Sequence, residues 1–126
     1  MKYYMTKSNN SVSAAKGKYV AKVSHYQTVD FDTIAERISD SCTLTKADII
    51  ATLTAFSHEM QRSLKDGDMV IMPGIGKFKL EMEVVPVDSP ADFEPSEHLK
   101  RFQLHVLPTM RHGKREVYQD IKLERE

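Results

Sequence analysis

The period of the hydrophobic pattern changes once along this chain, and that change constrains the class of fold. Between Ile49 and Leu64 the apolar residues recur at spacings of four, three, four and four, which places them on one face of a long helix. From Phe78 to Val84 apolar and charged residues alternate, as in a half-buried strand. The pattern therefore predicts an α+β protein in which helices precede a sheet.

Local signals at chain turns set the expected helix boundaries. The spacing of apolar residues predicts a first helix over about Asp30–Ser41, with Asp30 as its N-cap. Thr45, followed three residues later by Asp48, resembles a capping box and predicts the start of the second helix. Gly67 is expected just beyond the end of that helix, in the position that glycine favours.

The second half of the chain is predicted to form a three-stranded antiparallel sheet. Met69–Met72 and Phe78–Val84 are expected to pair as a β-hairpin, and Leu99–Leu107 supplies the third strand. Pro108 is predicted to stop that strand, because proline cannot donate to a ladder of hydrogen bonds. A short C-terminal helix is expected over Arg111–Asp120.

Residues 1–27 are predicted to be a basic β extension, and residues 28–126 the main domain. The extension is expected to contain strands at Lys2–Met5 and Lys18–Val23, joined by a polar loop. Its first 25 residues carry no acidic side chain but have five lysines, namely Lys2, Lys7, Lys16, Lys18 and Lys22.

Opposite charges are segregated along the chain although they cancel in the total. Eighteen basic residues balance eighteen acidic ones, so the net charge provides no long-range attraction to a polyanion. Outside the first 25 residues the chain carries 13 basic and 18 acidic side chains, a sum of −5. The segment Glu81–Glu97 has six carboxylates and no Lys or Arg. We therefore expect a surface with separate basic and acidic patches.

Two segments of the sequence resemble the HU and integration host factor family of bacterial DNA-bending proteins. The first is Phe31–Leu80, where Gly74-Ile75-Gly76-Lys77-Phe78 matches the family pattern Gly-apolar-Gly-Thr-Phe in all but the fourth residue. The second is Leu107–Lys114, which is similar to the family's Val-Pro-x-Phe-Arg-x-Gly-Lys. Together they cover about half the chain. The chain also looks like longer HU-like variants, which would account for Met1–Gln27 as an added strand region and Ile121–Glu126 as a short terminal strand.

The resemblance implies an intertwined homodimer. In that architecture the helices of two chains interlock beneath two sheets, and the interface is large, apolar and isologous. A second copy would cover the stripe Ile49–Leu64 and the sheet face Phe78–Val84. The alternative is a monomer whose N-terminal extension covers the same surface.

The chain departs from the family in the arm that embraces DNA. In HU and integration host factor a basic β-ribbon wraps the minor groove and inserts a proline between base pairs. Here the corresponding interval, Glu83–Glu97, is short and acidic, and it lacks the arm motif. Pro86, Pro90 and Pro95 are therefore interpreted as turn residues rather than intercalating wedges.

Six basic residues are the predicted DNA-binding set, with ordinary solvation as the alternative for each. Three of them are favoured because they share the polar sides of adjacent strands. The other three are favoured because two fall on the Arg-x-Gly-Lys signature, near the N-terminus of the expected last helix, whose amides would favour phosphate. The set is Lys77, Lys79, Arg101, Arg111, Lys114 and Arg115.

No catalytic constellation is found in the sequence, so we expect neither an enzyme nor a cofactor, metal ion or small-molecule substrate. His58-Glu59 lacks the second histidine of a zinc-protease helix, because Arg62 stands in its place. Cys42, the only cysteine, has no identifiable base partner and is interpreted as packed or idle. Gly74-x-Gly76 is not followed by the residues of a phosphate-binding loop.

We expect an architectural protein that binds double-stranded DNA with little base specificity through the dimer body, with the basic extension as a further candidate contact. We expect it to be cytoplasmic and associated with the nucleoid, because no signal peptide or membrane span is recognisable. The rival is an HU-like dimeric assembly module that has lost DNA binding.

Overall fold

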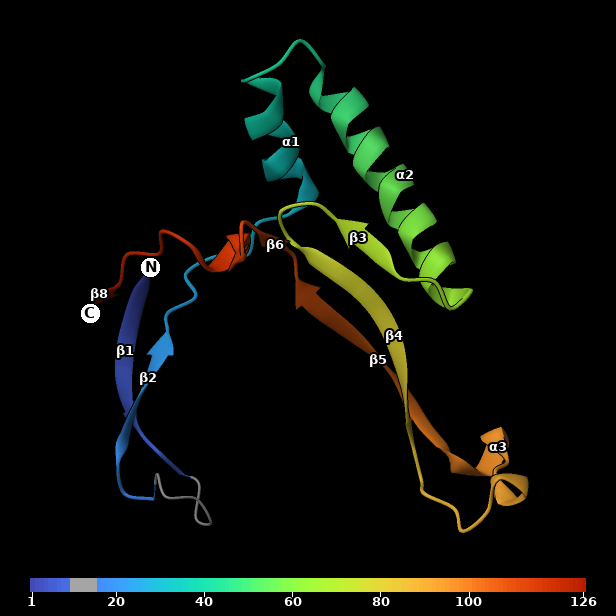
Figure 1. The fold of residues 1–126 in the computed structure, drawn as a ribbon. Helices are drawn as coiled ribbons and strands as arrows, with labels where there is room; N and C mark the ends of the chain where they lie inside the picture. Colours follow the sequence, from blue (N-terminus) through green and yellow to red (C-terminus); the bar gives the residue numbers. More distant parts are fainter. Residues whose placement is uncertain (10–15) are drawn as a thin grey trace.

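The computed structural model describes residues 1–9 and 16–126 as a mixed α+β chain (Figure 1). Most of the predicted polar loop between the first two strands falls on residues 10–15 and lies outside the described residues. In chain order the elements are β1 (Lys2–Lys7), β2 (Tyr19–Val23), α1 (Phe31–Ser39), α2 (Lys46–Lys65), β3 (Val70–Met72), β4 (Gly76–Val84), η1 (Pro90–Asp92), α3 (Pro95–His98), β5 (Leu99–Pro108), β6 (Met110–Arg111), β7 (Lys114–Arg115), η2 (Glu116–Tyr118) and β8 (Glu124–Arg125).

Both long helices begin at the predicted capping residues. The Asp30 carboxylate accepts a hydrogen bond from the Thr33 backbone N–H at 3.0 Å, which satisfies one free donor of α1. Thr45 Oγ1 accepts from the Asp48 N–H at 3.2 Å and donates to the Asp48 carboxylate at 2.7 Å. Helix α2 ends at Lys65, two residues before Gly67, whose φ of +90° favours glycine. The predicted helices are therefore confirmed, with α1 two residues shorter than expected at its C-terminal end.

The predicted three-stranded sheet is present, with the order β3-β4-β5 and antiparallel pairing throughout. Its register pairs Phe78 with Val106 and Met82 with Phe102, so apolar side chains from β4 and β5 share one face. Helix α2 packs against β3 and β4. Strands β4 and β5 approach each other closely at Gly76, because a Cβ there would lie 2.8 Å from the Leu107 carbonyl oxygen.

A second sheet joins the two ends of the chain. Strands β1 and β2 pair as an antiparallel hairpin, and the predicted short terminal strand is β8, which runs parallel to β1 beside Lys2 and Tyr3. This sheet, β2-β1-β8, is called the N-terminal sheet below. Figure 1 shows it apart from the helices, with the β1–β2 and β4–β5 hairpins both extending away from them.

The predicted C-terminal helix over Arg111–Asp120 is wrong. The segment instead forms the small β6–β7 hairpin and a single 3₁₀ turn, η2. His112 and Gly113 connect β6 to β7 with φ angles of +51° and +75°, and two successive left-handed residues match a tight hairpin turn but cannot continue a helix. Asp120, two residues after η2, also has a left-handed backbone, with φ of +58°.

The chain by itself buries little apolar surface. Among the described residues the buried apolar side chains are Ala35, Ile49 and Leu64, all from the two long helices. On the sheet, Met82 and Phe102 are each 60% exposed. The apolar face of β4 and β5 is therefore uncovered in a single copy. No described helix combines the length and the apolar character needed to cross a membrane.

Gly76→Ala should separate β4 from β5 near the site described below. The added methyl would press on the Leu107 carbonyl and on Val106 Cγ1, 2.8 and 2.9 Å away, so we expect a loss of about 1–3 kcal/mol in urea unfolding. The NMR contacts between Lys77 and Leu107 should weaken with it. Gly67→Ala is the control, because its methyl meets nothing within 4 Å and costs only backbone strain, about 1 kcal/mol. Unchanged contacts across β4 and β5 in Gly76→Ala would contradict this view of the turn.

Candidate nucleic-acid interface

Lys77, Lys79 and Arg101 lie on the polar face of the β4–β5 pair, as predicted from the alternation. The register places Lys79 opposite His105 and Arg101 opposite Glu83. Because side chains alternate between the two faces of a strand, these cations project away from the apolar face. The same face also carries Glu81 and Glu83.

Two of these three cations are neutralised within the sheet. Lys79 Nζ lies 2.7 Å from a carboxylate oxygen of Glu81, and Arg101 Nε lies 2.5 Å from a carboxylate oxygen of Glu83. His105 Nε2 adds a contact to Glu81 at 3.1 Å. Lys79 and Arg101 therefore present little net positive charge to a phosphate.

These contacts lower the pKa of the Glu81 carboxyl. The hydrogen bond from Lys79 lowers the pKa of Glu81, and the nearby His105 and the Lys79 charge lower it further. A carboxyl whose folded-state pKa is lowered stabilises the fold above its ordinary pKa, and that contribution is lost as the pH falls through the folded-state value. The Lys79–Glu81 pair is therefore intact at neutral pH.

Lys77 differs from its two neighbours because it forms no ion pair in the described part of the chain. It is half-buried at the start of β4, opposite Leu107. A hollow of about 320 Å³ beside it is lined by Leu107, Pro108, Thr109 and Met110. Lys77 thus lies next to the segment that leads into β6.

The β6–β7 hairpin carries the other three predicted cations. Arg111 pairs with Lys114 and Met110 with Arg115 in the register, and the three basic side chains are exposed. Within the described ranges none of the three forms an ion pair. The helix N-terminus expected to assist them is absent, so phosphate contact here would depend on side-chain charge. The term basic edge is used below for Lys77, Arg111, Lys114 and Arg115.

The far end of the β4–β5 pair is short and acidic, as the sequence predicted. The connection from Val85 folds into η1 and α3, each begun by a proline, Pro90 and Pro95. Phe93 stacks on His98 with ring centroids 5.7 Å apart, and the His98 ring accepts a hydrogen bond from the Glu94 N–H at 2.9 Å. Pro90 and Pro95 thus each begin a short helical turn, and Pro86 lies in the connection before them.

No group of three or more His, Cys, Asp or Glu side chains is placed to hold a metal ion in the described residues. Cys42 is exposed rather than packed.

The fold defines a class of chain, a small α+β protein in which two helices precede a three-stranded sheet. The family of HU domains fused to a winged helix-turn-helix, an immunoglobulin-like domain or a glycine-rich motif, HU-HIG, matches residues 1–125. The chain belongs to this family, which supports DNA binding in general.

One solved structure extends the comparison. The crystal structure of a protein from Bacteroides vulgatus ATCC 8482, described as a candidate bacterial DNA-binding protein, superimposes with a TM-score of 0.66 at 11% sequence identity. The match covers 98% of this chain and 47% of that one, so this chain spans about half the length of that protein. At this identity the likeness establishes the fold alone. No curated protein matches the chain.

Lys79→Gln should return the pKa of Glu81 toward its ordinary value, because the substitution removes the hydrogen bond and the charge that lower it. An NMR pH titration of the Glu81 side-chain carboxyl would measure the change. Lys77→Gln is the matched control, since it removes the same charge from the same strand without touching Glu81. Equal effects from the two substitutions would contradict the specific ion pair.

Proposed function

We propose that the chain is a non-catalytic architectural protein that binds double-stranded DNA as a homodimer, in the nucleoid, through the phosphate backbone. In this proposal residues 28–126 form the DNA-binding domain and residues 1–27 a basic extension. Membership of the HU-HIG family supports the DNA partner. The observation that carries the proposal for this chain is the basic edge, whose four cations have no ion-pair partner in residues 1–9 and 16–126.

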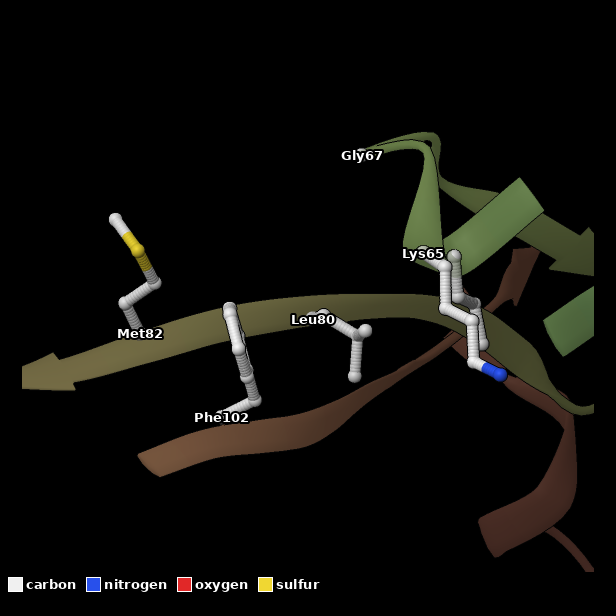
Figure 2. A pocket seen from close by; sticks show the side chains of 6 residues that line it. Lys65, Gly67, Leu80, Met82 and Phe102 are labelled. Carbon is white, nitrogen blue, oxygen red and sulfur yellow. The ribbon is translucent and has the colours of Figure 1, made fainter. Parts of the chain in front are cut away.

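The uncovered sheet face supports the dimer. An apolar hollow of about 520 Å³ is lined by Leu64, Lys65, Gly67, Leu80, Met82 and Phe102, and Figure 2 shows the last three along β4 and β5. Large apolar side chains exposed together on one face, such as Met82, Phe102 and Leu104, favour a protein–protein contact there. A second copy presents the same apolar face, so an isologous contact would cover both at once.

The basic edge replaces the six-residue set as the main proposed contact. Phosphate binding draws its free energy from the release of counterions by cationic side chains. Lys79 and Arg101 would have to give up Glu81 and Glu83 first, so their contribution is smaller. Base-specific readout is not expected, because contacts to phosphate position a protein without reading sequence. Bending should be weaker than in relatives with a basic arm, because the β4–β5 tip carries carboxylates.

Removing Arg111 and Lys114 should weaken duplex binding more than removing Lys79 and Arg101. Each double substitution to Gln removes two positive charges, so overall electrostatics change equally. We expect R111Q/K114Q to lower the slope of log affinity against log salt by about one unit per lost phosphate contact, and K79Q/R101Q to lower it by less. Fluorescence anisotropy with one duplex at several salt concentrations measures both slopes.

Two outcomes of that titration would count against the proposal. If the wild-type chain does not bind the duplex at low ionic strength, the DNA function is wrong and the assembly-module rival is favoured. If the two double variants behave alike, DNA binding stands but the basic edge is not its main contact.

Releasing Lys79 and Arg101 from their ion pairs should strengthen duplex binding. The double variant E81Q/E83Q removes the carboxylates that neutralise Lys79 and Arg101. We expect tighter duplex binding and a salt slope steeper by about one unit for each cation that reaches a phosphate. E94Q/E97Q is the matched control, because it removes two carboxylates from the far end of the hairpin, where no cation is paired to them. If E81Q/E83Q strengthened duplex binding no more than E94Q/E97Q does, the proposed contribution of Lys79 and Arg101 would be contradicted.

The rival function rests on the acidic end of the β4–β5 pair. Asp88, Asp92, Glu94 and Glu97 are exposed there, and a surface of this charge fits a basic protein segment better than DNA. An HU-like dimer that serves as an assembly module would use this end and would be insensitive to loss of the basic edge.

A further inference from the structure

The N-terminal sheet has two chemically different faces. The register pairs Tyr3 with Val23, Tyr4 with Lys22 and Met5 with Ala21. Because side chains alternate along each strand, Tyr3 and Met5 share one face with Ala21 and Val23. A hollow of about 400 Å³ is lined by these four residues, by Leu123 and by part of Lys22. The face is therefore mainly apolar.

The opposite face is basic. Lys2 and Lys22 lie on it together with Tyr4, and the backbone bond from the Ser8 N–H to the Lys18 carbonyl, 2.8 Å, continues the register to place Lys18 there as well. All three lysines and Tyr4 are exposed. The basic face is defined here as Lys2, Lys18, Lys22 and Tyr4. Lys7 pairs with Tyr19 on the other face.

The basic face keeps its charge. None of its lysines forms an ion pair within the part of the chain that the structure describes, whereas Lys79 and Arg101 on the other sheet are both paired. The nearest register position with an acid is Glu124 of β8, opposite Lys2, and Glu126 accepts a hydrogen bond from Tyr26. Lys18 and Lys22 are on β2 or at its start, on the side of β1 away from β8.

We propose that the basic face of the N-terminal sheet is a second contact for the phosphate backbone of duplex DNA. This inference rests on the proposed function, and it adds a contact surface separate from the basic edge. Several cations on one face of a sheet suit a backbone of phosphates, and each neutralised phosphate adds counterion release. The surface would supply the β-hairpin contact that the acidic β4–β5 end cannot provide.

Lys22 and Lys7 offer a matched test, because they carry the same charge on opposite faces of one hairpin. We expect Lys22→Gln to lower the salt slope of duplex binding by about one unit per contact, and Lys7→Gln to leave it close to wild type. Lys22→Arg should retain wild-type binding, which shows that the loss is one of charge and not of folding. The triple variant K2Q/K18Q/K22Q should lower the slope about three times as far.

The outcomes separate this inference from the function on which it rests. If Lys7→Gln and Lys22→Gln weaken binding equally, the face assignment is overturned. If neither changes binding while R111Q/K114Q does, the N-terminal contact is overturned and the proposed function stands. If wild type does not bind the duplex at low salt, both fail together. Tighter, Lys22-dependent binding to a single strand of the same length would overturn the assignment to duplex DNA.

Discussion

The uncovered apolar face of the β3-β4-β5 sheet is the constraint on which the rest of the structure depends. Each large apolar side chain moved out of water contributes about 1.5–3 kcal/mol, and much of that gain is forgone where Met82, Phe102 and Leu104 are more than half exposed. The buried apolar residues of the described chain come from α1 and α2 alone. A second copy covering this face would complete the core, fix the distance between two sets of strands, and so set where the cations of each protomer lie.

Charge on this scaffold is arranged by strand pairing more than by composition. The register brings Arg101 onto Glu83, and the alternation along β4 brings Lys79 beside Glu81, so the sheet neutralises its own polar face. Among the proposed contacts, the cations without an ion pair in the described residues lie at the start of β4, on the β6–β7 hairpin and on the extension. This division explains how a chain with zero net charge can be proposed to bind DNA.

Much of the fold could be predicted because its signals are local. Asp30 and Thr45 cap their helices through side chains three residues from their partners. The prediction of a C-terminal helix was wrong because the identity of His112 does not reveal its left-handed backbone. The next residue, Gly113, is a turn signal. Arg101 and Glu83 are 18 residues apart in the sequence, and their pairing depends on the register between β4 and β5, which alternation alone does not fix. The family resemblance supplied the Arg-x-Gly-Lys site but placed it before a helix.

The association of two chains through the sheet face is the claim most directly open to measurement. Sedimentation equilibrium and thermal unfolding over a wide range of protein concentration would report mass and stability together. We expect a dimer whose midpoint of thermal unfolding rises with protein concentration, because folding and association are coupled. A folded, compact monomer at high dilution, with a midpoint independent of concentration, would contradict it.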